Sequence, residues 1–255
     1  GLPGSARHAA HDLNDRSNLA DRPTLFKYHT ALMTDRNEDL STRERILNAS
    51  ESLFAELGFD GVSLRMITQR AGVELALANY HFGPKKELFA AVVERRALEL
   101  NEARRTALES LGPTPALEDL IDAFTRPFLE KSARGGAGWK SYARLVAQIA
   151  NSPRWTDTVM ATQFDPVARL FIEKAQQALP DSAIPDVYWG FHFLLGAMTT
   201  TFAETGRIDQ LSHGTCRSDD LDTIHARMIP FLAAGFRAIC RPASDRTRGK
   251  RTSGN

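Results

Sequence analysis

The chain has 255 residues, of which 42% are hydrophobic and 25% are charged, so it is long enough for one large domain or two modest ones. Its 32 basic and 31 acidic residues leave a net charge of +1, which neither indicates nor excludes a nucleic-acid ligand. No apolar run reaches the roughly 20 residues of a membrane helix, and the N-terminal segment lacks the apolar core of a secretory signal. Cys216 and Cys240 fit neither a disulfide framework nor a zinc-finger spacing, so we expect a reducing, cytoplasmic location and no metal.

The two ends of the chain differ from the sequence between them. Residues 1–40 are polar and aperiodic, and residues 242–255 combine Arg, Lys, Ser and Gly with little apolar content, so both are predicted to be disordered tails. Between them, apolar residues recur three and four positions apart, and no alternating strand pattern is present. The sequence therefore predicts an all-α fold.

Three short helices are predicted after the first tail. The first begins at Ser41 or Thr42 and ends at Gly58, a second spans residues 63–72, and a third spans residues 74–82. The second and third are joined by a tight turn, which is the layout of a helix-turn-helix. In that motif the second helix must protrude to enter a major groove about 12 Å wide.

A long helix is predicted to follow, from Lys85 towards Leu111, and Gly112 and Pro113 end it. Further helices are predicted near residues 116–131, 139–150, 153–179, 185–204 and 219–240, with a polar loop over residues 206–218. The predicted divisions are a tail at 1–40, a helix-turn-helix domain at 41–84, a linking helix at 85–112, a larger helical domain at 113–241 and a tail at 242–255. The arginines of the linking helix are interpreted as mostly a solvated face: Arg95, Arg96, Arg104 and Arg105.

Residues 41–96 resemble a known family. The segments that carry the resemblance are Thr42–Leu47, Leu53–Phe59, Val62–Leu64, Ala71–Val73 and Tyr80–Phe82. They look like the N-terminal domain of the TetR/AcrR family of bacterial regulators, whereas the rest of the chain shares only an all-helical layout of suitable size. The resemblance implies a three-helix DNA-binding domain followed by a larger domain that dimerises and binds a small molecule. The implied function is a sequence-specific transcriptional regulator, usually a repressor, that a ligand releases from its operator.

The family's DNA contacts, carried over by position, imply a set of candidate residues in this chain: Thr42, Ser63, Arg65, Leu75, Ala76, Asn79, Tyr80, His81 and Lys85. Thr42 and Ser63 stand at helix starts that suit phosphate, and Lys85 is expected to pair with phosphate. Glu74 departs from the family's usual Ser or Thr, and a carboxylate there would repel phosphate. The Asn79-Tyr80 order resembles the branch that includes regulators of fatty-acid metabolism. Tyr80 could instead be a core aromatic residue.

The second domain offers candidates for a ligand pocket, although the same residue types also fill protein cores: Tyr142, Trp155, Phe164, Phe171, Trp189, His192 and Met198. They favour a largely apolar effector, such as a lipid-like acid or thioester. Apolar stripes on the last two long helices are expected to form the homodimer interface, unless they face their own core: Phe191, Leu194, Leu195, Met198 and Phe202, with Leu221, Ile224, Met228, Leu232, Gly235 or Phe236, and Ile239.

Two other function classes were weighed. An enzyme is not expected, because the sequence has no GxSxG, P-loop or HExxH motif, and no cofactor is implied. A protein-partner adaptor that has lost DNA binding remains an alternative, and Glu74 is its only support.

Overall fold

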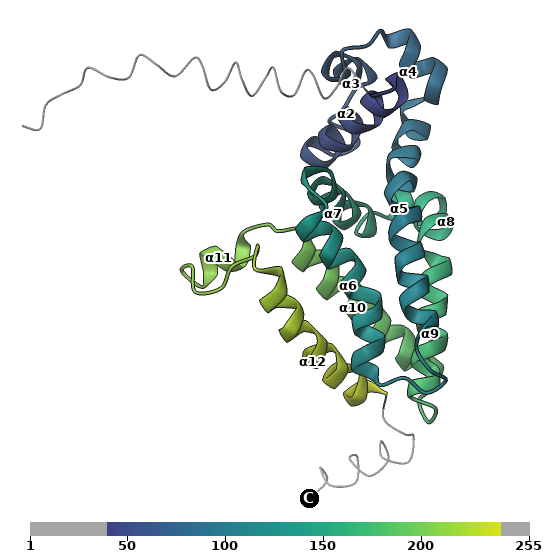
Figure 1. Ribbon diagram of the computed structural model, residues 1–255, viewed down its shortest axis with the longest axis vertical. Helices are drawn as coiled ribbons and strands as arrows, with labels where there is room; N and C mark the ends of the chain where they lie inside the picture. The colour runs from purple at the N-terminus through teal and green to yellow at the C-terminus, as the bar shows by residue number, and fades with distance from the viewer. Residues whose placement is uncertain (1–39, 241–255) are drawn as a thin grey trace, which may run out of the picture. The chain divides into compact units, whose positions relative to one another are not determined.

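The computed structural model describes residues 40–240, and every regular element in that range is helical, which confirms the all-α prediction there. Residues 42–240 pack as one compact unit (Figure 1). Apart from Leu40, the predicted tails lie outside the described residues. The helix-turn-helix domain predicted at residues 41–84 is called the head below. Its separation from a second domain stays a prediction, because its helices share a continuous hydrophobic core with the helices that follow.

The first three helices begin and end within one or two residues of the predicted positions. They are α2 (Thr42–Leu57), α3 (Leu64–Ala71) and α4 (Leu75–Phe82). The Ser63 side chain caps α3 by accepting from the backbone N–H of Met66 at 3.2 Å. Gly58 and Gly72, with φ of 70° and 63°, adopt the left-handed conformation that ends α2 and α3. Local chain chemistry therefore sets these boundaries.

Arg45 of α2 holds the turn between α3 and α4. Its Nε and Nη2 donate to the carbonyl of Ala71 at 3.1 and 2.8 Å, and Nη2 also donates to the carbonyl of Gly72 at 2.7 Å. The last carbonyls of a helix lack partners within the helix, so a charged donor placed there stabilises its end. The orientation of α4 consequently depends on α2.

The remaining helices build the larger part of the unit: α5 (Lys85–Glu109), α6 (Leu117–Arg134), α7 (Ala137–Ala150), α9 (Asp165–Ala178), α10 (Ile184–Phe202) and α12 (Leu221–Ile239). α5 packs against α6 and α9, while α10 packs against α7, α9 and α12. A Cβ at Gly190 of α10 would collide with the Phe236 ring of α12, so glycine permits the close approach of those helices. Figure 1 shows α3 and α4 at the end of the unit opposite the C-terminal end of α12.

Two predicted segments were wrong. The single helix expected over residues 153–179 is instead a 3₁₀ turn, a π-helical turn, a short helix and a longer one: η1 (Pro153–Trp155), η2 (Thr156–Met160), α8 (Ala161–Gln163) and α9. Pro166 explains the break between α8 and α9, because it lies in the first turn of α9 and has no N–H to continue the preceding helix. The expected loop at residues 206–218 contains the short helix α11 (Arg207–Leu211).

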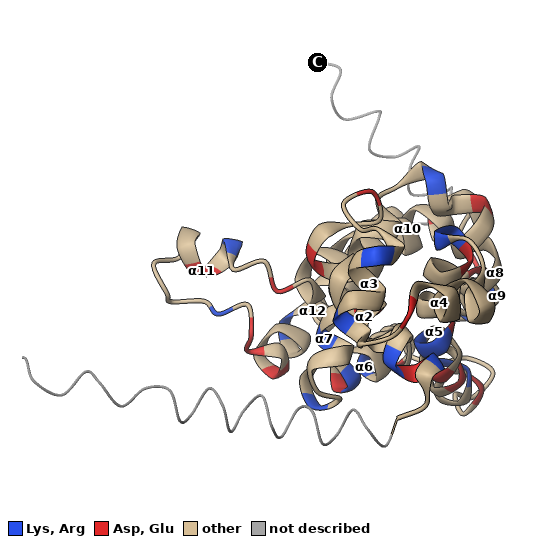
Figure 2. Cartoon of the chain, turned by 90° about the horizontal axis from the view of Figure 1, so that it is seen from above, with Lys and Arg blue, Asp and Glu red and all other residues tan. Residues whose placement is uncertain are grey.

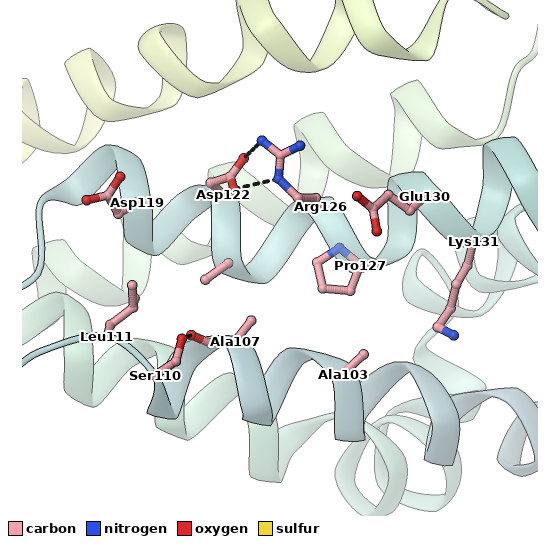
Figure 3. Close-up of a pocket in the computed structure, with 11 residues that line it drawn as sticks. Ala103, Ala107, Ser110, Leu111, Asp119, Asp122, Arg126, Pro127, Glu130 and Lys131 are labelled. Carbon is pink, nitrogen blue, oxygen red and sulfur yellow. Dashed lines mark hydrogen bonds and ion pairs between the residues drawn. The ribbon is translucent and has the colours of Figure 1, made fainter.

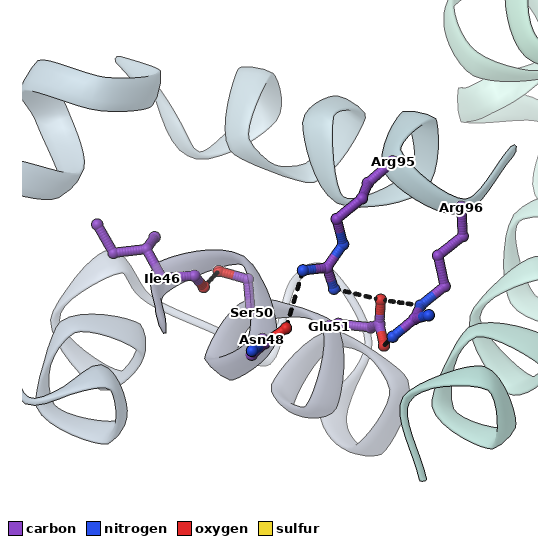
Figure 4. Close-up of polar contacts among 6 residues, drawn as sticks. All are labelled: Ile46, Asn48, Ser50, Glu51, Arg95 and Arg96. Atoms are coloured by element: carbon purple, nitrogen blue, oxygen red, sulfur yellow. Dashed lines mark hydrogen bonds and ion pairs between the residues drawn. The ribbon is translucent and has the colours of Figure 1, made fainter. Parts of the chain in front are cut away.

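A buried carboxylate joins α2 to α5 (Figure 4). Glu51 is only 2% exposed, and it accepts from Nη2 of Arg95 at 2.7 Å and from Nε and Nη2 of Arg96 at 2.6 and 2.9 Å. Arg95 also donates to Oδ1 of Asn48 at 2.8 Å. A Cβ at Gly138 of α7 would collide with the Arg96 guanidinium, so α7 closes over this ion-pair cluster. Glu51, Arg95, Arg96 and Gly138 are called the Glu51 junction below.

An aromatic cluster strengthens the same contact between the head and the rest of the unit. The Trp155 ring stacks on Phe89 of α5 with a centroid separation of 4.3 Å, and it meets the edge of Phe59 at 4.9 Å. The amide of Gln148 in α7 donates to the carbonyl of Ala55 in α2 at 3.0 Å. Aromatic and polar contacts together fix α2 against α5 and α7.

We expect Glu51→Gln to destabilise the protein by about 3 kcal/mol, because the change leaves two arginine side chains facing a neutral amide in a buried site. The free energy of unfolding in urea measures the loss. Glu56→Gln is the matched control: Glu56 lies on the same helix and is exposed, with Arg70 at 3.4 Å, so its loss should cost less than about 1 kcal/mol. Equal effects of the two changes would contradict a structural role for the junction.

Candidate nucleic-acid interface and ligand cavity

Helix α4 presents nearly all of its side chains to solvent. Ala78 is its only buried residue, whereas Leu75 and Tyr80 are 43% and 84% exposed. Apolar side chains normally face a core, and an exposed apolar patch on a protruding helix marks an interaction surface. Tyr80 is therefore a surface residue, and the alternative that it fills the core is wrong.

The other candidate DNA-contacting residues lie on or next to α2, α3 and α4. The described surface exposes Ser63, Arg65, Ala76, Asn79 and His81, while Thr42 is half-buried at the start of α2. The Asn79 amide donates to the carbonyl of Leu75 at 3.3 Å within α4. These residues all belong to the helix-turn-helix or to α2 before it.

Lys85 has a different role from the predicted phosphate contact. Its Nζ donates to the carbonyls of Phe59 and Val62 at 2.8 and 2.7 Å and lies 4.2 Å from the centroid of the Phe59 ring. The ammonium thus braces the turn between α2 and α3. The adjacent Lys86 is exposed and has no hydrogen bond or ion pair within the described residues, so its ammonium is available for phosphate. Position in the family's sequence pattern had favoured Lys85 for that contact.

Charge around the helix-turn-helix is mixed. Figure 2 looks onto α3 and α4 and shows Lys and Arg segments around them, with acidic segments interspersed. Glu74 precedes α4, is exposed and makes no side-chain cap hydrogen bond. Basic and acidic residues are thus intermingled around these helices, so phosphate contacts would come from individually placed cations such as Arg65 and Lys86.

A small cavity of about 80 Å³ lies between α5, α6, α7, α9 and α10. Its walls are mostly apolar, and the residues that line it include Leu100, Phe124, Phe128, Val146, Phe164, Phe191 and Met198. Arg104 and Thr199 add polar groups inside it, and Asp165 lies half-buried at its lining. An apolar cavity with a few polar groups is typical of small-molecule sites.

The structure separates the seven predicted ligand residues. Phe164 and Met198 line the cavity, and Phe171 and Tyr142 are buried beside it against Phe124 and Phe128, with centroid separations of 5.1 and 6.2 Å. Trp155 belongs to the aromatic cluster at the junction. Trp189, 57% exposed, and His192 lie on the outer face of α10 and do not line this cavity.

Sequence reasoning missed most residues that line the cavity, and Arg104 is the charged one among them that is fully buried. It was assigned to a solvated face, yet only 2% of it is exposed. Arg95 and Arg96 are half-buried at the Glu51 junction, so among the four only Arg105 is exposed. Helical periodicity placed Arg104 four residues after the core residue Leu100, which was the available signal.

The predicted dimer stripes pack mainly into the chain's own core. The buried members are Phe191, Leu194, Met198 and Phe202 of α10, and Leu221, Met228, Leu232 and Phe236 of α12. A different apolar face is exposed, formed by Tyr188, Trp189 and Phe193 of α10 and Phe231 of α12. Ala197 and Phe231 border one open groove of about 630 Å³, so the exposed sides of α10 and α12 share a surface.

A second groove, of about 550 Å³, lies between α5 and α6 (Figure 3). Three of its five charged lining groups, Asp122, Arg126 and Lys131, have ion-pair partners. Asp122 accepts two hydrogen bonds from Arg126 at 2.7 Å, and Lys131 pairs with Glu99. Across residues 40–240, no cluster of three or more His, Cys, Asp or Glu side chains could hold a metal, and no helix is long and apolar enough to cross a membrane.

Comparisons with known proteins match two separate parts of the chain. Residues 46–92 match the family model of bacterial regulatory proteins of the tetR family, and residues 122–235 match that of the tetracyclin repressor-like C-terminal domain. The chain is 38% identical over 117 residues to the HTH-type transcriptional regulatory protein RaaS of Mycobacterium tuberculosis, covering 46% of this chain and 47% of RaaS. It is 32% identical over 81 residues to the HTH-type transcriptional repressor NicS of Pseudomonas putida, covering 31% and 38%. It thus matches less than half the length of either relative.

Solved structures share the fold at low sequence identity. A TetR-like transcriptional regulator from Rhodococcus sp. RHA1 is 19% identical with a TM-score of 0.57, covering 78% of this chain and 95% of that one. FadR from Bacillus subtilis, solved with stearoyl-CoA, is 14% identical with a TM-score of 0.53, covering 75% and 98%. With one family model on the helix-turn-helix, another on the larger helical part and this shared fold, the chain belongs to the TetR family of bacterial regulatory proteins.

Proposed function

We propose that this chain is a cytoplasmic, sequence-specific DNA-binding transcriptional regulator. The proposal rests on α4, a short helix that exposes Leu75, Asn79, Tyr80 and His81 to solvent. Hydrogen bonds from α2 hold the turn that precedes this helix. A protruding helix can enter a major groove, where Asn reads adenine and apolar groups contact thymine methyls. Regulators and repressors among the relatives support this assignment, and repression is the proposed outcome of binding.

The proposed regulator acts as a homodimer through the exposed faces of α10 and α12. Large aromatic side chains in solvent are unfavourable unless a partner covers them, and Trp189, Phe193 and Phe231 lie on these faces. A two-fold interface of this kind would present two copies of α4 to two DNA half-sites.

The proposed effector is a small, largely apolar molecule that enters the cavity between α5 and α10. Helices α5 and α7 contribute both to the cavity walls and to the Glu51 junction, so a ligand could change the position of α4. The effect on DNA affinity is limited by the ligand's differential affinity for the two conformations. The FadR neighbour that was solved with stearoyl-CoA supports an apolar ligand for this fold.

The test of DNA binding begins with sequences that the wild-type protein selects from a random duplex pool at about 0.1 M salt. We expect Tyr80→Ala to raise the dissociation constant for a selected duplex about tenfold, because base-edge contacts each contribute about 1–3 kcal/mol. Fluorescence anisotropy measures the affinity. Because Tyr80 is 84% exposed, the melting temperature should not change.

Tyr80→Phe is the companion variant, because it keeps the ring and removes the hydroxyl. A loss confined to Tyr80→Ala would assign the contact to the ring. If the folded wild-type protein selects no sequence, the DNA-binding proposal fails. The adaptor alternative, which the exposed Glu74 carboxylate favours, would then be preferred.

The dimer is tested with Phe231→Glu, which places a charge at a side chain that is 73% exposed in the single chain. We expect the dimer dissociation constant to rise at least about thirtyfold, since a central aromatic residue often contributes about 2 kcal/mol or more. Sedimentation equilibrium measures the constant. Leu98→Glu is the control, because Leu98 is 63% exposed on α5, outside the proposed interface. Equal self-association of the wild type and both variants would rule out this interface.

A further inference from the structure

Arg104 is a buried cation without an acidic partner. Its Nε donates to the carbonyl of Phe124 at 2.9 Å, and its Nη2 makes a weak contact with the sulfur of Met198 at 3.4 Å. No carboxylate among the described residues lies within 4.0 Å of it, and its Nη1 makes no hydrogen bond there. A guanidinium has five N–H groups, so most of its donor capacity is unused.

Aromatic faces compensate the charge only in part. The guanidinium lies 4.2 Å from the centroid of the Phe124 ring and 5.6 Å from that of Phe128. Burial lowers the pKa of Arg104 to about 10, which leaves the side chain protonated at neutral pH. A buried charge is stabilised well only when it is paired and hydrogen-bonded, so this site lacks a negative charge.

The unused donors belong to a residue that lines the cavity. Of the two other polar lining side chains, Thr199 donates to the carbonyl of Leu195 at 2.8 Å, and Asp165 lies 3.5 Å from Arg169 with its side chain 44% exposed. The Tyr142 hydroxyl is buried and has no hydrogen-bond partner within residues 40–240. Arg104 and Tyr142 lie close enough for each to affect the pKa of the other. The positive charge and the unused donors of Arg104 therefore lie at the wall of an apolar cavity.

We propose that Arg104 binds the carboxylate of a small organic acid whose apolar body fills the cavity. The planar guanidinium matches the two oxygens of a carboxylate, and the dry apolar walls strengthen the pairing. The cavity volume of about 80 Å³ is small, so the acid is a short one. The inference rests on the proposed function in that it identifies the chemical class of the effector.

The binding test uses hexanoate and benzoate as probes, each beside its neutral amide, with the full chain in an isothermal titration calorimeter at pH 7. At least one acid should bind the wild type at least about tenfold more tightly than its amide, since a buried charge-assisted pair contributes more than a neutral hydrogen bond. Arg104→Met should lose this preference and Arg104→Lys should keep part of it. Failure of both acids to bind, or equal binding of acid and amide, would overturn the proposal.

A second measurement separates ligand binding from a purely structural role. If Arg104 serves a ligand, Arg104→Met without ligand should melt at or above the wild-type temperature, because an apolar side chain of similar length replaces an unpaired buried charge. If Arg104 is a structural brace, the melting temperature should fall by about 5 °C or more. The proposal would be overturned if the melting temperature of Arg104→Met fell in this way while Arg104→Lys and Arg104→Met both still bound the acid more tightly than its amide.

DNA binding is measured separately, so the two proposals fail in distinguishable ways. Acid binding without any sequence-selective DNA binding would leave the Arg104 site standing and remove the regulator. DNA binding with no acid preference would leave the regulator and remove the Arg104 site. If both hold, hexanoate or benzoate should release DNA from the wild type and not from Arg104→Met.

Discussion

The buried carboxylate of Glu51 is the constraint on which the arrangement of the unit depends. A carboxylate can remain in such a place only if cations reach it, and Arg95 and Arg96 do so from one side of α5. Gly138 permits α7 to pass directly over the pair. α2 also holds the turn before α4 through Arg45. The position of α4, the proposed recognition helix, is therefore fixed relative to α5 and α7, and no flexible linker separates them.

The same helices connect this junction with the cavity. Arg96 and Arg104 are eight residues apart on α5, which is about 12 Å along the helix axis. α7 closes over the Glu51 junction with Gly138 and lines the cavity with Val146. A ligand that displaces either helix must therefore alter the packing around Glu51, and the recognition helix moves with α2. The proposed release of DNA needs no other connection between the two sites.

The sequence predicted best what depends on neighbouring residues in the chain. Ser63 and Gly72 delimit α3 through local capping, and most helix boundaries followed from such signals. It predicted poorly what depends on tertiary packing. Periodicity shows that a helix has an apolar side but not which neighbour covers it, so the exposed Trp189 was expected in a pocket and the buried Leu194 at a dimer face. Charge was misleading in the same way: Lys85 braces a turn and Arg104 is buried, although basic side chains are usually solvated.

The most direct test of the central claim is the affinity of the purified protein for duplexes in which the distance between two selected half-sites is varied. Two recognition helices fixed to a rigid dimer require half-site centres about 10 base pairs, or a multiple, apart. The account predicts that the two selected half-sites are inverted repeats of each other. Inserting about 5 base pairs between them should lower the affinity at least about tenfold, because the insertion turns one half-site to the opposite face of the DNA. Affinity that is independent of the spacing would show that the heads move independently of the larger helical part, and would contradict the account.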